Sequence, residues 1–198
     1  FIRNGHCMMM FPTVFRTPNL LGCWRIDEGS RNIRLRGGEY VGSPVGIWVD
    51  GEDTSLVTQN LGTIQAVTEE SIRVTNGAHG NAFRGVTIKA SGRHGVVFEH
   101  APDNTLAAYM GGENWGPLTT LPTSPPEWQY QTAKPTWGNI NGSGYSGVKV
   151  AGLSARCSVR HQVLGANGAS GVTVTGAPGD TGTDVYPAFV VVEDNVIG

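Results

Sequence analysis

Five four-residue segments of the chain share one pattern of apolar and variable positions. The second and fourth residues are apolar, whereas the third varies freely, and this alternation is typical of a strand with one face in a core. β-branched residues fill most of the apolar positions, as is common in strands. The segments are residues 46–49, 71–74, 95–98, 147–150 and 171–174.

The pattern returns at a nearly constant interval of about 24 residues, from starts at 46, 71, 95, 147 and 171. A further copy fits at 22–24, and residues 195–197 open another. The step of 52 residues from 95 to 147 spans about two periods, and one coil with a long excursion explains it. Repetition of this kind is the signature of a stacked architecture.

Two more short strands are expected between successive starts. One lies about ten residues after a start and the other about sixteen after it. The first group is 32–35, 55–57 and 81–83, and the second is 64–67, 86–88, 161–164 and 189–192.

Three short strands per period, divided by Gly, Asn and Asp, predict an all-β fold, a right-handed parallel β-helix. Each coil buries its inward face only by stacking on its neighbours, about 4.8 Å apart. We expect residues 1–198 to form one such domain, a fragment of a longer chain. A β-sandwich is the alternative, since Asn-Gly pairs suit hairpins, but a sandwich has no reason to keep a 24-residue step.

The periodic pattern loosens before residue 147, and residues 111–146 are predicted to be a loop insertion rich in Pro, Trp and Tyr. Loops of this length are often functional. Two interpretations are open: an aromatic-bearing loop that binds a ligand or a neighbouring subunit, with Trp115 as a candidate for substrate binding, and a surface flap whose Trp residues pack on the coils.

Composition narrows the class of protein. Gly contributes 29 of 198 residues, which suits many tight turns and not helices. The net charge is −2 and no basic stripe occurs, so nucleic acid is not an expected partner. No apolar run reaches membrane-span length. Cys7, Cys23 and Cys157 have no metal-binding spacing, and neither a disulfide framework nor a metal or other cofactor is expected.

The third position of each segment should face outward, which places Trp48 and Arg73 in one external row. Trp24 joins this row in one register, and a shift of one residue would bury it. An aromatic ring beside an Arg suits sugar binding, because the ring packs against the C–H face of a pyranose. The plainer interpretation is a half-covered Trp under a loop.

Acidic residues gather just after the strands, where the chain turns. Asp50 and Glu99 each follow a segment directly, two coils apart, so their backbones should lie roughly 9–10 Å apart. This approaches the separation at which paired carboxylates hydrolyse a glycosidic bond with inversion. Solvated acids at turn corners are the alternative. The further candidates for catalysis are Glu52, Asp53, His100 and Asp103.

Several runs resemble known β-helix families. Residues 29–38, 171–176 and 193–198 resemble pectin-lyase-like β-helices, and residues 95–112 are similar to coils of bacteriophage tailspikes. The adjacent Asp-Asp pair of polygalacturonases is absent, which argues against their mechanism.

The tailspike resemblance implies a homotrimeric protein of the virion tail that binds bacterial surface polysaccharide outside the cell. We expect it to hydrolyse this polysaccharide through the pair Asp50 and Glu99, with Trp48 and Arg73 holding sugar. A polysaccharide lyase, a non-catalytic adhesin or tail segment, and a secreted pectinase-like enzyme remain the alternatives.

Overall fold

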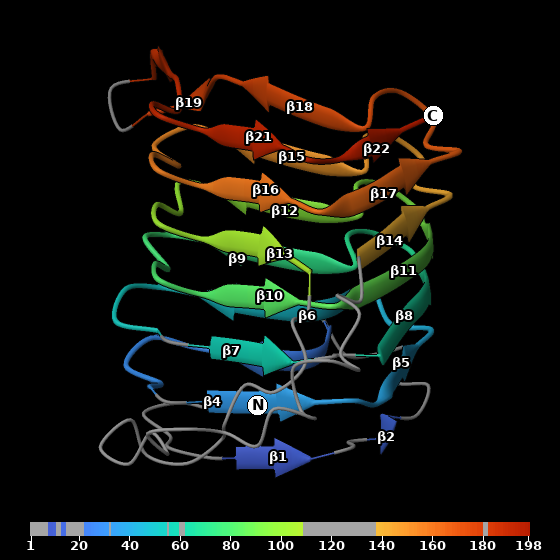
Figure 1. The fold of residues 1–198 in the computed structure, drawn as a ribbon. Helices are drawn as coiled ribbons and strands as arrows, with labels where there is room; N and C mark the ends of the chain where they lie inside the picture. The colour runs from blue at the N-terminus through green and yellow to red at the C-terminus, as the bar shows by residue number, and fades with distance from the viewer. Residues whose placement is uncertain are drawn as a thin grey trace, which may run out of the picture.

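The computed structural model describes residues 8–10, 13–14, 22–31, 33–54, 56–59, 62–108, 138–179 and 182–198. These residues form an all-β structure without a helix, as the sequence predicts. Three parallel sheets and one two-stranded antiparallel ribbon account for the strands (Figure 1).

Each parallel sheet takes every third of the first eighteen strands, and the two strands of the ribbon precede the last strand of the second and of the third sheet. The first sheet contains β3 (Gly22–Ile26), β6 (Val45–Asp50), β9 (Ile72–Thr75), β12 (Val96–Glu99), β15 (Val148–Ala151) and β18 (Val172–Thr175). The second contains β1 (Met8–Met10), β4 (Ile33–Arg36), β7 (Leu56–Gln59), β10 (Ala82–Arg84), β13 (Thr105–Ala107), β16 (Ser158–Arg160) and β21 (Val191–Glu193).

The third sheet contains β2 (Thr13–Val14), β5 (Glu39–Val41), β8 (Gly62–Val67), β11 (Val86–Ser91), β14 (Gly138–Asn141), β17 (Gln162–Gly165) and β22 (Val196–Ile197). The antiparallel ribbon pairs β19 (Ala177–Pro178) with β20 (Asp184–Val185). Three consecutive strands, one per sheet, form a set that we call a layer. Each layer pairs with the layer before and the layer after it, from blue to red in Figure 1.

The register between layers confirms the predicted inward columns. In the first sheet Ile47 pairs with Ile72, Ile72 with Val96, and Val96 with Val148. All four side chains are fully buried. The in-register stacking therefore turns a sequence repeat into a continuous apolar core.

The other two sheets supply matching columns to the same core. In the second sheet Phe83 pairs with Leu106, and Leu106 with Val159. In the third sheet the buried column is Tyr40, Ile64, Ile88, Ile140 and Leu164. The rings of Phe83 and Phe98 meet inside the core, with centroids 6.2 Å apart.

A column of glycines allows the layers to approach closely at one corner. A Cβ on Gly144 would lie 2.3 Å from the Gly92 carbonyl oxygen, and one on Gly168 would lie 2.2 Å from that of Gly144. Backbone hydrogen bonds also link this corner, from Gly144 N to Ser91 O and from Gly168 N to Ser143 O. Part of the glycine excess is thus a consequence of the layer spacing.

A ladder of buried asparagines satisfies the backbone at a second corner. The Asn81 backbone N–H and side-chain amide both donate to Asn104 Oδ1, each at 2.9 Å. Asn104 Nδ2 donates to the carbonyls of Ala78 and Ala101, also at 2.9 Å. Asn81 Oδ1 accepts the Leu56 backbone N–H at 2.8 Å. The ladder thus links three successive layers through polar groups that water does not reach.

The step of 52 residues is a single layer and not two. Val96 pairs directly with Val148, so one layer contains the long connection between β13 and β14, as the excursion interpretation predicts. Strand β14 lies inside the predicted loop 111–146, so residues 138–141 are not loop. Residues 109–137, with Trp115, lie outside the described residues.

Two predicted strand assignments near the C-terminus are wrong. The repeat predicts 189–192 as the strand about sixteen residues after a start, but β21 pairs with β16 in the second sheet. It predicts that residues 195–197 open a new copy in the first sheet, but β22 pairs with β17 in the third. The ribbon β19–β20 inserts extra residues after β18, and this displaces the 24-residue frame.

Truncation of Asn104 should destabilise the fold strongly. We expect Asn104→Ala to lower the free energy of unfolding by about 3 kcal/mol, because several buried donors and acceptors lose their partners. The exposed Lys89 gives the control, because Lys89→Ala should change the free energy of unfolding by less than about 0.5 kcal/mol. Urea denaturation followed by circular dichroism measures both. Equal effects of the two substitutions would contradict a structural role for the ladder.

Candidate functional site

The outward row of the first sheet carries charged and aromatic side chains. Trp48 pairs with Arg73, Arg73 with Val97, Val97 with Lys149, and Lys149 with Thr173, as the alternation predicts. The register of the first layer decides between the two that the sequence allows for Trp24. Arg25 pairs with Trp48, and Trp24 pairs with Ile47. Trp24 therefore belongs to the inward column and packs against the core instead of facing a ligand.

Trp48 is held between two arginines of neighbouring layers. The Arg25 guanidinium carbon lies 4.4 Å from the ring centroid, and that of Arg73 lies 5.2 Å from it. The indole Nε1 donates to Thr75 Oγ1 at 2.9 Å. These cation–π contacts hold the ring in place, and Trp48 also lines the surface depression that contains Glu99.

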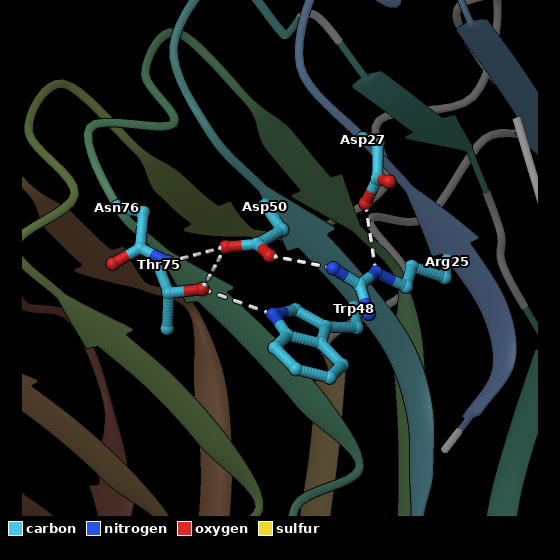
Figure 2. Close-up of polar contacts among 6 residues, drawn as sticks. All are labelled: Arg25, Asp27, Trp48, Asp50, Thr75 and Asn76. Carbon is cyan, nitrogen blue, oxygen red and sulfur yellow. Dashed lines mark hydrogen bonds and ion pairs between the residues drawn. The ribbon is translucent and has the colours of Figure 1, made fainter. Parts of the chain in front are cut away.

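Asp50 is the centre of a hydrogen-bonded cluster (Figure 2). Thr75 Oγ1 donates to Asp50 Oδ1 at 2.8 Å, and Asn76 Nδ2 donates to the same oxygen at 2.7 Å. Arg25 Nη2 donates to Oδ2 at 3.0 Å, while its Nε donates to Asp27 Oδ1 at 2.7 Å. Three donors therefore converge on one carboxylate, which can accept about four hydrogen bonds.

The predicted pair Asp50 and Glu99 lies in one column. Asp50 pairs with Thr75, and Thr75 pairs with Glu99, so the two acids are separated by two layer steps, roughly 9–10 Å of backbone. They line neighbouring depressions, and Asn76 lines both. The depression at Asp50 also contains Glu52.

The remaining predicted acids lie apart from this pair. Asp53 forms an ion pair with Arg31 at 2.8 Å, and both side chains are largely exposed. Asp103 accepts two hydrogen bonds from Arg156, each 2.6 Å long, and these hold the pKa of its carboxyl below the ordinary value. Both contacts bridge consecutive layers at the surface.

An open groove with a volume of about 580 Å³ runs along the outward face beside Glu99. Its cationic lining residues are Arg73, Arg93 and Lys149, and its acids are Glu70 and Glu99. Arg73 makes ion pairs with Glu69, at 2.6 Å, and with Glu70. Within the described residues, Glu99 makes no side-chain hydrogen bond or ion pair.

His94 and Tyr145 form an aromatic wall of the groove. Their ring centroids are 5.5 Å apart, and Tyr145 is more than half exposed. His94 Nδ1 accepts the backbone N–H of Ser146 at 3.2 Å. Burial lowers the pKa of His94, as does the charge of Lys149. The neutral ring that results carries its proton on Nε2, so it offers a donor.

His100 completes the groove beside Glu99. Its Nδ1 accepts the backbone N–H of Leu153 at 3.4 Å. Gly152, with φ +63°, lies against the ring, and a Cβ there would come within 2.6 Å of it. Glycine at this turn therefore makes room for His100 beside the next layer.

The groove brings together residues that the sequence analysis left apart. Glu70 and His94 line the groove, and the backbone N–H of Ser146 donates to His94. Each of the three residues directly precedes a repeat segment of the first sheet, so stacking makes them neighbours. Their equal distance from the segment starts is the signal that identifies them. Tyr145 stands in the range predicted as loop and carries no repeat signal of its own.

No protein-family model, no curated protein and no solved structure matches the chain. Among the residues that the structure describes, no group of three or more His, Cys, Asp or Glu could hold a metal ion. In the same residues no helix is long and apolar enough to cross a membrane.

Stability should fall on acidification partly through His94. Its pKa is lower in the folded chain than the ordinary value of about 6.5, so the unfolded chain binds more protons as the pH falls below about 7. The resulting loss of folding stability begins at about pH 7 and continues as the pH falls through the pKa of His94 in the folded chain. We expect the Tm to drop about 1–2 °C less for His94→Gln than for the wild type between pH 7.5 and 5.5. Scanning calorimetry measures this, and identical drops would contradict the account.

Proposed function

We propose that this chain is a section of a right-handed parallel β-helix of the phage tailspike type, and that it binds bacterial surface polysaccharide. The three parallel sheets, in which each strand pairs with the equivalent strand of the neighbouring layer, support the architecture. The resemblance of residues 95–112 to tailspike coils supports the biological class, which is a homotrimer on the virion tail.

The groove along the first sheet is the observation that carries the proposed binding. It is open and lined by polar groups of both charges from successive layers. Tyr145 offers an exposed ring for the C–H face of a sugar. Charged groups and the donor of His94 can bind hydroxyl groups beside it. An extended polymer fits such a surface better than a small ligand, which needs an enclosed pocket.

The proposed chemistry is hydrolysis by Asp50 and Glu99, with distinct roles for the two acids. Three donors surround Asp50, so it is the proposed base, and about one acceptor position is left for the attacking water. Glu99 makes no described polar contact, so it is the proposed acid that protonates the leaving oxygen. Their separation of two layers suits an inverting mechanism.

Binding without cleavage is the second candidate function. It is favoured by the same contacts of Asp50, because a carboxylate held by Arg25, Thr75 and Asn76 also serves as a structural link between layers. An adhesin or structural tail segment would keep the groove and the aromatic wall but release no oligosaccharide.

The two functions differ in what the protein releases from purified capsule or lipopolysaccharide. We expect oligosaccharide release by the wild type and a loss of at least about 100-fold for Asp50→Asn and for Glu99→Gln, because acid–base catalysis contributes that much. Glu39→Gln, an exposed change on the third sheet, is the matched control. Binding without release supports the adhesin, and unchanged release by both variants excludes the pair.

Sugar binding should depend on the exposed ring of Tyr145. We expect Tyr145→Ala to weaken binding to the polysaccharide about tenfold, since a stacking contact of this size is lost. Tyr145→Phe should retain most of the affinity. Biolayer interferometry with immobilised polysaccharide measures both, and equal affinity of the alanine variant and the wild type would contradict the proposed platform.

A further inference from the structure

We infer that the groove selects polysaccharides with anionic sugars, and that Lys149 and Arg93 bind their acidic groups. This inference rests on the proposed function, since it specifies the glycan class for the same groove. It concerns two positive charges that have no partner among the described residues and that the stacking contact and the hydrolysis do not use.

Lys149 is the first of these charges. It stands in the outward row on β15, between Val97 of the previous layer and Thr173 of the next. Its side chain is partly buried, and within the described residues it makes no ion pair or hydrogen bond. A partly desolvated ammonium group without a counter-ion is unfavourable, so an anionic ligand would improve its environment.

The other cations of the outward row are already neutralised. Arg25 binds Asp27 and Asp50, and Arg73 binds Glu69 and Glu70. Lys149 and Arg93 differ from them, because no described carboxylate pairs with either. The unpaired charge is therefore confined to the part of the groove next to Tyr145.

The groove also differs in charge from the molecule as a whole. Three cations and two acids line it, Arg73, Arg93 and Lys149 against Glu70 and Glu99, whereas the chain has a net charge of −2. A local excess of positive charge on an acidic protein attracts anions to that place. The neutral His94 adds a donor beside Lys149 without adding charge.

The arrangement suits an acidic group carried on a sugar. Tyr145 would contact the ring, while Lys149 and Arg93 would bind its carboxylate or phosphate by charge-assisted hydrogen bonds. Sugar carboxylates and sugar phosphates share this chemistry, and the experiment separates them.

The test measures binding of the full chain to defined polymers. Four are anionic (alginate, hyaluronan, polysialic acid and a teichoic acid) and two are neutral (dextran and carboxyl-reduced hyaluronan). We expect binding to at least one anionic polymer and none to the neutral ones. Teichoic acid alone would identify a phosphate, and a carboxylate polymer alone a uronic or sialic acid. Affinity should fall several-fold as salt rises, because the charges are screened.

Substitutions test whether Lys149 and Arg93 cause the preference for anionic polymers. Lys149→Met keeps the aliphatic stem, and we expect it and Arg93→Gln each to weaken binding to the anionic polymer by about fivefold or more. Lys89→Met removes the same charge from the third sheet and is the matched control, with an expected change below about twofold.

The possible outcomes separate this inference from the proposed function. Equal binding to hyaluronan and its carboxyl-reduced form, or binding to dextran alone, overturns the anionic class but keeps polysaccharide binding. Equal losses for Lys149→Met and Lys89→Met also overturn the assignment. Absence of binding to all six polymers contradicts both the proposed function and the inference.

Discussion

In-register parallel hydrogen bonding between layers is the constraint on which the other features of this chain depend. It places equivalent residues of successive layers in columns, so an apolar residue in one layer meets an apolar residue in the next. The core is continuous for this reason, although no single layer could bury its own inward face. Polar corners obey the same constraint, as the stacked Asn81 and Asn104 show.

The outward face of the first sheet divides into two parts under this constraint. In the first part, Arg25, Asp50 and Thr75 satisfy one another across three layers, and Trp48 is held by arginines of the layers beside it. Such contacts stabilise the stack, and Asp50 keeps about one acceptor position for the attacking water of the proposed hydrolysis.

The second part lies one to two layers further along the chain. There Glu99, Lys149 and Arg93 have no described partner, and Tyr145 is exposed. Unpartnered charge beside an exposed ring is the feature that separates a binding surface from a structural one. The binding part of the candidate site is therefore defined by groups that their neighbours leave unsatisfied.

The repeat predicted most of the columns, because a period-2 pattern at a fixed step specifies both strand and register. It did not decide whether Trp24 faces the core, because the register of the segment that begins at Gly22 is ambiguous by one residue. Aligning Asp27, which follows Ile26, with Asp50, which follows Val49, would have decided it. The 24-residue step also failed to predict the strands after β18, because the ribbon β19–β20 adds residues to that layer. The groove was harder to predict, since Tyr145 lies outside the repeating segments.

Engineered disulfides between layers test the central claim most directly. In a variant without the native cysteines, Thr87→Cys and Asn139→Cys should cross-link on mild oxidation, because adjacent strands lie about 4.8 Å apart and suit a disulfide. Thr87→Cys with Val163→Cys spans two layers and should remain reduced. Peptide mapping that finds the first link and not the second supports the stacked register; the reverse result would contradict it.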